Sequence, residues 1–145
     1  MPQSGITFRI EENLDFSFGK ETEVVHWINK VLKNEKKIPG NIAYLFCTDE
    51  YLLKINRQFL NHDFYTDIIT FDYSGKNKTE GEIFISIDRV KENAQTFKQT
   101  FQKELMRTII HGILHLCGYK DKTPADIKKM RMEEDKALAL LKIKV

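Results

Sequence analysis

Only two cysteines occur in this 145-residue chain, too few for a small disulfide-stabilised scaffold. Cys47 and Cys117 both lie in apolar runs, where a free thiol behaves as a small hydrophobic side chain, so we expect buried thiols in a reducing compartment. No run approaches the roughly 18 apolar residues that a membrane span needs. Residues 1–10 also lack the basic and then apolar order of a secretory signal. The protein is therefore expected in the cytoplasm, with no membrane partner.

An excess of charge of one sign is missing too. The chain has 23 Lys+Arg against 21 Asp+Glu, a formal net charge of +2. That is not the strong basic excess typical of a nucleic-acid binder. From Lys98 to the end, however, basic residues outnumber acidic ones. This last third of the chain carries either an ordinary solvated helical surface or a basic face for a polyanion.

Neither of the glycine-rich patterns that bind nucleotides, G-x-G-x-x-G and the P-loop, is present, so no nucleotide cofactor is expected. The length favours one domain, residues 1–145, because chains divide mainly above roughly 250 residues. No internal repeat or low-complexity linker contradicts a single domain.

Hydrophobic periodicity predicts an α+β (mixed α/β) fold, a small mixed sheet of about four strands packed with about five helices. The expected strands are 5–10, 41–47, 67–73 and 82–87, and the polar turn 74–78 joins the last two into an antiparallel hairpin. Pro39-Gly40 is expected to break the chain before the second strand. The expected helices are 20–33, one capped by Thr48, one capped by Asp88, 100–116, and one from Thr123 to about 141.

His111 and His115 lie four residues apart on the predicted helix 100–116, so their imidazoles share one face. The rest of this helix is largely apolar, and Gly118 can turn the chain back after it. Asp121 could then return to the same cation. Two imidazoles, one carboxylate and an open position suit a catalytic zinc on a central buried helix. The alternatives are core histidines and an ordinary turn or cap aspartate.

Glu104 lies on the same helical line as the two histidines, about 10 Å along the axis from His111. That separation is too long for direct ligation. Glu104 is therefore an acid that supports the metal ligands, a group that faces substrate, or a surface salt-bridge partner of Arg107 or of residues near Thr100. Zinc proteases carry their general base directly after the first histidine of H-E-x-x-H, and this chain has Gly112 there, which argues against proteolysis.

The segment from His111 to Tyr119, HGILHLCGY, resembles the signature H-G-x-L-H-L-x-G-Y-D-H of the YbeY endoribonucleases. Further segments are similar to other motifs of that family: TDIITF at 66–71, GEIFIS at 81–86, and the M-x-x-x-E spacing from Met130 to Glu134. The resemblance runs in the same order from about Ile55 to Leu141.

This resemblance implies a zinc-dependent endoribonuclease specific for single-stranded RNA. The family acts in 16S rRNA 3′-end maturation and in ribosome quality control, which implies ribosomal RNA and the small ribosomal subunit as partners. It also implies a site of three histidines. His111 and His115 match, whereas Asp121 stands where the third histidine falls. A carboxylate there leaves zinc possible and shifts the preference toward harder ions such as Mn²⁺.

A second departure concerns the family motif L-N-x-x-Y-R, whose arginine is thought to contact RNA phosphate. Leu60 occupies that position in this chain, and Arg57, on roughly the same helix face, is either its substitute or a plain surface residue. The predicted catalytic residues are thus His111, His115, Arg57 and Glu104. The predicted RNA contacts are Arg57, Lys98, Lys103 and Arg107, with further candidates at Lys128, Lys129 and Arg131.

The mechanism has two open alternatives for the nucleophile, a water of lowered pKa or the RNA 2′-hydroxyl. An alternative function is also open: a ribosome-assembly or RNA-binding factor with a structural metal site and weak or no hydrolysis. The replaced third histidine and the missing family arginine both motivate that alternative.

Overall fold

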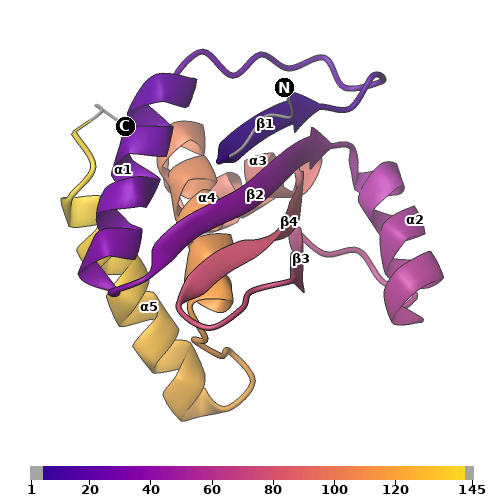
Figure 1. The fold of residues 1–145 in the computed structure, drawn as a ribbon. Coiled ribbons are helices and arrows are strands. Elements are labelled where there is room, and N and C mark those ends of the chain that lie inside the picture. Colours follow the sequence, from indigo (N-terminus) through magenta and orange to yellow (C-terminus); the bar gives the residue numbers. More distant parts are fainter. Residues whose placement is uncertain (1–4, 143–145) are drawn as a thin grey trace.

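The computed structural model describes residues 5–142 and shows a four-stranded sheet with five helices in that range (Figure 1). This confirms the predicted α+β class. In chain order the elements are β1 (Ile6–Ile10), α1 (Glu21–Asn34), β2 (Ile38–Cys47), α2 (Asp49–Leu60), β3 (Ile68–Asp72), β4 (Lys78–Ser86), α3 (Ile87–Thr96), α4 (Phe101–Leu116) and α5 (Pro124–Ala139).

The strands lie in the order β1-β2-β4-β3. β2 pairs in parallel with β1 and with β4, because a helix crosses over between each of those partners in the chain. β3 and β4 pair antiparallel, with Ile69 opposite Phe84, so the predicted hairpin is confirmed. The sheet is therefore mixed, as expected.

The main core lies on one face of the sheet, where α1, α4 and their neighbours cover the strands (Figure 1). Alternate strand residues such as Tyr44, Phe46, Ile83 and Ile85 are at most 1% exposed there. A smaller cluster on the other face contains Cys47, Leu52 and Ile69 beneath α2. α2 thus lies on the face opposite the helical layer, and the next element, β3, lies at the edge of the sheet.

Helix α4 has the boundaries that its capping residues predict. The Thr100 side chain accepts a hydrogen bond from the Lys103 amide at its start. At its end Gly118 has φ +103°, and the amides of Gly118 and Tyr119 bond back to the carbonyls of His115 and Leu114. This motif reverses the chain and brings the loop of Asp121 alongside the last turn of the helix.

Helix α5 begins where the sequence predicts, because Thr123 and Asp126 form a capping box with Pro124 in the first turn. Two other predictions are wrong. Ser86, and not Asp88, caps α3, and the Asp88 carboxylate instead accepts from the Asp49 amide of α2.

Pro39-Gly40 does not break the second strand, which begins at Ile38. A register shift between Pro39 and Ile42 absorbs the irregular pairing with β4 and lets the strand continue. Cys47 is fully buried as expected, Cys117 is partly buried, and both thiols are free. Within residues 5–142, no helix combines the length and apolar character that crossing a membrane requires.

Candidate metal centre

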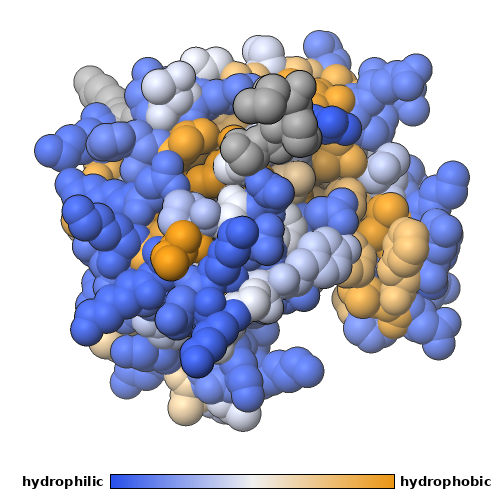
Figure 2. Space-filling view, viewed as in Figure 1, coloured by the Kyte–Doolittle hydropathy of each residue, from blue (hydrophilic) through white to orange (hydrophobic). Residues whose placement is uncertain are grey.

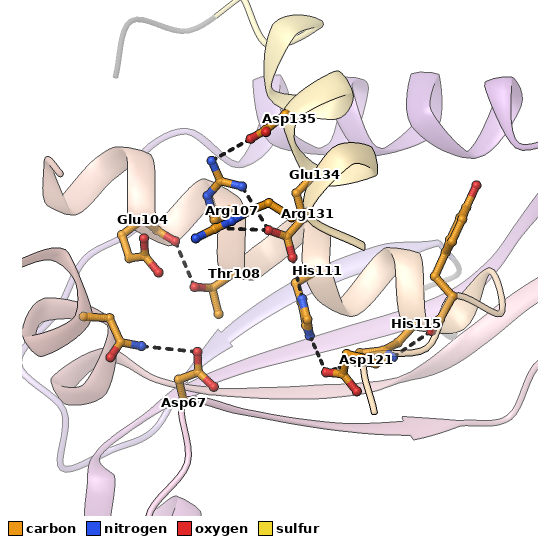
Figure 3. A network of polar contacts seen from close by, with 12 residues as sticks. Asp67, Glu104, Arg107, Thr108, His111, His115, Asp121, Arg131, Glu134 and Asp135 are labelled. Carbon is orange, nitrogen blue, oxygen red and sulfur yellow. Dashed lines mark hydrogen bonds and ion pairs between the residues drawn. The ribbon is translucent and has the colours of Figure 1, made fainter. Parts of the chain in front are cut away.

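His111 and His115 face Asp121 at the C-terminal end of α4 (Figure 3). The Nε2 atoms of the two histidines lie 3.3 and 3.2 Å from the same oxygen, Oδ2 of Asp121. The two rings are nearly perpendicular, with centroids 4.5 Å apart. One ligand atom from each residue lies within 4.8 Å of the others. The structure therefore brings together the three residues predicted as ligands, and they could hold one cation.

The other ring nitrogen of His111 is held by Glu134 of α5. Its Nδ1 lies 2.6 Å from Oε2 of this carboxylate, which is only 6% exposed. Arg107 donates to Oε1 of the same carboxylate at 2.9 Å and to Asp135 at 2.9 Å, and Arg131 adds a longer contact of 3.5 Å to Glu134. Glu134 is thus fixed between two arginines and a histidine (Figure 3).

This network shifts the pKa values of both partners. Burial acts to lower the pKa of His111, but the hydrogen bond and charge of Glu134, with the charges of Asp121 and Asp67, raise it above its ordinary value. Burial acts to raise the pKa of Glu134, but His111 and Arg107 outweigh it and lower that pKa. Both shifts favour a charged Glu134 that accepts the Nδ1 proton of His111.

His115 is oriented by the backbone instead. Its Nδ1 lies 3.0 Å from the carbonyl oxygen of Tyr119, in the turn that Gly118 makes possible. A carbonyl oxygen and a carboxylate can only accept, so in the neutral rings both histidines carry their proton on Nδ1. Both Nε2 lone pairs then point at the Asp121 carboxylate. Three acceptors facing one another need a cation or a proton between them, and this donor set suits a divalent metal.

Gly112 explains how α4 can lie so close to the sheet. A Cβ atom at this position would stand 3.0 Å from the Ile83 side chain and 3.2 Å from that of Ile68. The residue after the first histidine therefore faces β3 and β4 and not the cleft. A general base placed there, as in the zinc proteases, would point into the core.

The three candidate ligands open into a cleft of about 1000 Å³. Asp67 and Glu104 lie on its wall, on the far side of His111 from Asp121 (Figure 3). Burial raises the pKa of each, and Glu104 is only 7% exposed. Asn93 donates to Asp67 at 3.3 Å. No hydrogen bond or ion pair to the Glu104 carboxylate is seen among the described residues.

The remaining predicted residues fall into two groups. Glu104 and Arg107 line the cleft, together with Leu60 and Arg131. The guanidinium of Arg107 binds Glu134 and Asp135, so Glu104 is not its partner. Arg57 is 58% exposed and pairs with Asp63, and neither it nor Lys98 or Lys103 lines the cleft. The predicted roles of these residues in RNA binding or catalysis stay predictions.

Sequence reasoning missed the roles of Glu134 and Asp67. Both stand inside recognisable motifs, but the motifs say nothing of what the side chains contact. Glu134 is 23 residues from His111, and only the docking of α5 onto α4 brings them together. The one usable signal was a carboxylate on the predicted final helix at helical spacing from the apolar residues Met130 and Ala137, both of which are buried.

Two comparisons with known proteins agree on the family. Residues 9–142 match the family model described as Endoribonuclease YbeY. A protein named Endoribonuclease YbeY from Flavobacterium psychrophilum is 50% identical over 139 residues, which cover 96% of this chain and 98% of that protein. The protein of the same name from Cytophaga hutchinsonii is 51% identical over 136 residues, 93% of this chain and 95% of the relative.

The fold has a solved counterpart as well. The solution structure of TM1509 from Thermotoga maritima matches with a TM-score of 0.65 and 27% sequence identity, over 94% of this chain and 88% of that one. A family model that matches residues 9–142, and relatives about half identical along nearly the whole chain, show that the chain belongs to the YbeY endoribonuclease family.

Proposed function

We propose that this protein is a metal-dependent endoribonuclease that hydrolyses phosphodiester bonds of single-stranded RNA in the cleft beside His111 and His115. Family membership supports the reaction class. The observation that carries the metal dependence is the meeting of three acceptors, Nε2 of both histidines and Oδ2 of Asp121, with both Nδ1 atoms already engaged. A water molecule has only two protons to donate and cannot satisfy all three acceptors, whereas one cation can bind all three.

The chain's own residues prepare this site. Glu134 and the Tyr119 carbonyl keep the Nδ1 protons in place, so both Nε2 atoms stay available as ligands together with Asp121. A divalent metal held by these residues would supply Lewis-acid stabilisation of charge on a phosphodiester and would make a water molecule more acidic. Glu104, buried on the cleft wall with a raised pKa, suits the transfer of a proton during the reaction.

Positive charge along the cleft suits the RNA backbone. Lys120, Lys122 and Arg131 line the cavity, and the first two make no ion pair among the described residues. Arg107 also lines it but is engaged by two carboxylates, so its contribution to RNA binding is indirect. Arg57 would have to release Asp63 before it could reach a phosphate in the cleft.

Zinc is the proposed resident metal, because two imidazoles and a carboxylate form a common catalytic zinc set. Mn²⁺ is the alternative, since the carboxylate replaces a third imidazole and favours harder ions. The proposed compartment is the cytoplasm, and the proposed partners are ribosomal RNA and the small ribosomal subunit. The proposed process is 16S rRNA 3′-end maturation. Residues 1–145 act as a single domain in this proposal.

The test is cleavage of a single-stranded RNA oligonucleotide by the purified protein, with and without a chelator. We expect cleavage that the chelator abolishes, that added Zn²⁺ or Mn²⁺ restores, and that His111→Ala removes. His26→Ala is the matched control, because His26 is exposed on α1 and lies outside the cleft. RNA binding without cleavage under any metal would favour an assembly factor instead, and cleavage that survives both chelator and His111→Ala would contradict the proposal.

A further inference from the structure

Two different walls border the candidate metal centre within the same cleft. The basic rim, defined as Lys120, Lys122 and Arg131, comes from the α4–α5 loop and α5. The aromatic rim, defined as His62, Phe64 and Phe97, comes from the α2–β3 loop and the end of α3. The basic rim follows from the need to hold phosphates. The metal ligands and the core do not account for the aromatic rim.

The aromatic rim is exposed to solvent. Phe64 and Phe97 are each 54% exposed. The rings of His62 and Phe64 stack on each other in solvent, with centroids 5.1 Å apart and planes 22° from parallel. Leu60, 40% exposed, lies in the same cleft. Figure 2 shows apolar surface over α2, the helix that leads into this loop.

The loop that carries the stacked pair is held in place. Asn56, 1% exposed, donates its side-chain amide to the Phe64 carbonyl at 2.9 Å. Its own carbonyl accepts from the His62 amide at 3.1 Å. The side chain and the backbone carbonyl of Asn56 thus hold the backbone at Phe64 and at His62. The rings are therefore presented on a fixed backbone, which reduces the entropy lost when a ligand stacks on them.

We propose that the aromatic rim is a stacking site for nucleobases, so that RNA lies with its phosphates on the basic rim and its bases on His62 and Phe64. The inference rests on the proposed function, since it names how the same cleft recognises its substrate. Flat aromatic faces next to a basic wall are how proteins bind unpaired bases. Bases in a duplex are already stacked and cannot occupy such faces, so the rim selects single strands.

Phe64→Trp gives a direct readout of stacking. The chain's single tryptophan, Trp27, is only 3% exposed in the core and serves as a constant background. We expect a single-stranded RNA oligonucleotide to quench the fluorescence of the new indole, whereas an abasic oligonucleotide of the same length does not. Tyr73→Trp is the matched control, because Tyr73 is 61% exposed but lies outside the cleft.

Phe64→Ala measures the contribution to affinity. We expect it to weaken binding of the intact oligonucleotide about fivefold or more and to leave binding of the abasic one unchanged. Tyr73→Ala should change neither. Equal quenching by the intact and abasic strands, or an intact-strand affinity unchanged by Phe64→Ala, would overturn the stacking site.

The two proposals fail separately, because quenching reports contact and not cleavage. Base-dependent quenching in a protein that never cleaves RNA would remove the proposed function and leave the stacking site. Metal-dependent cleavage without base-dependent quenching would support the proposed function and overturn the stacking site.

Discussion

Helix α4 has two faces of opposite character. Leu105, Ile109 and Ile113 on the sheet side are fully buried, and Gly112 lets the backbone approach Ile83 closely. On the cleft side Glu104, Thr108, His111 and His115 follow one another at helical spacing, and each histidine is tied at Nδ1. The apolar face therefore fixes the position of the helix against the sheet. The polar face carries the ligand atoms, whose positions depend on that packing. Changes on the two faces should separate stability from metal binding.

The largest stability effect is expected on the apolar face. Ile109→Ala removes a fully buried side chain and leaves a cavity, so the free energy of unfolding should fall by about 2–5 kcal/mol. Denaturant titration would measure the fall. Ile127→Ala is the control, because Ile127 is 54% exposed on α5, and it should change stability by less than about 0.5 kcal/mol. Loss of the metal from folded Ile109→Ala molecules would show that the two faces are not separable.

The next largest effect, on metal affinity, is expected where Glu134 orients His111. Glu134→Gln keeps the shape of the side chain but removes the negative charge that orients the imidazole, so metal affinity should fall about 10- to 100-fold. Competition with a chromogenic chelator would measure it. Asp135→Asn removes the other carboxylate bound to Arg107, at a side chain 61% exposed, and should leave affinity nearly unchanged. Equal losses in both variants would assign the effect to Arg107 and not to His111.

A smaller effect, on stability, is expected from Glu104 on the cleft side of α4. Burial raises the pKa of Glu104 above its ordinary value of 4.5, so the fold favours its protonated form. The stability that the neutral acid contributes is present at low pH and is lost as pH rises through the folded-state pKa. Glu104→Gln should therefore be more stable than the unmodified protein at neutral pH, by a few tenths to about 1 kcal/mol.

This difference should shrink as pH falls through the folded-state pKa of Glu104, and it should be gone below about 4.5, where the acid is protonated in the folded and the unfolded state alike. Thermal unfolding from neutral pH down to about 4.5 checks it. Glu12→Gln, at an exposed position after β1, is the control and should change stability by less than about 0.5 kcal/mol. A neutral-pH destabilisation in Glu104→Gln would mean that the ionised carboxylate has a stabilising partner.

The comparison of faces also shows what sequence can predict. The apolar rows of α4, its start near Thr100 and its Gly118 stop are local patterns, and each is confirmed. The cluster of His111, His115 and Asp121 was predictable because all three lie within eleven residues joined by one turn. The Ser86 cap was missed because Asp88 is an equally good capping residue by type, and only the backbone distinguishes them.

Contacts between distant segments were beyond reach of the sequence. Glu134 reaches His111 only because α5 packs on α4, and Arg57 points to Asp63 because the loop after α2 folds back. The aromatic rim likewise combines residues from two separate loops. The spacing of residues in the sequence does not predict these contacts, because they depend on how whole helices and loops pack against one another.

If His111, His115 and Asp121 together hold one divalent metal, bound zinc should depend on each of the three residues. The decisive measurement is the zinc bound by the purified protein and by His115→Ala, Asp121→Ala and His26→Ala after dialysis against the same zinc solution. We expect about one ion per chain in the unmodified protein and in His26→Ala, and essentially none in the other two. Full zinc occupancy in His115→Ala and Asp121→Ala would contradict it.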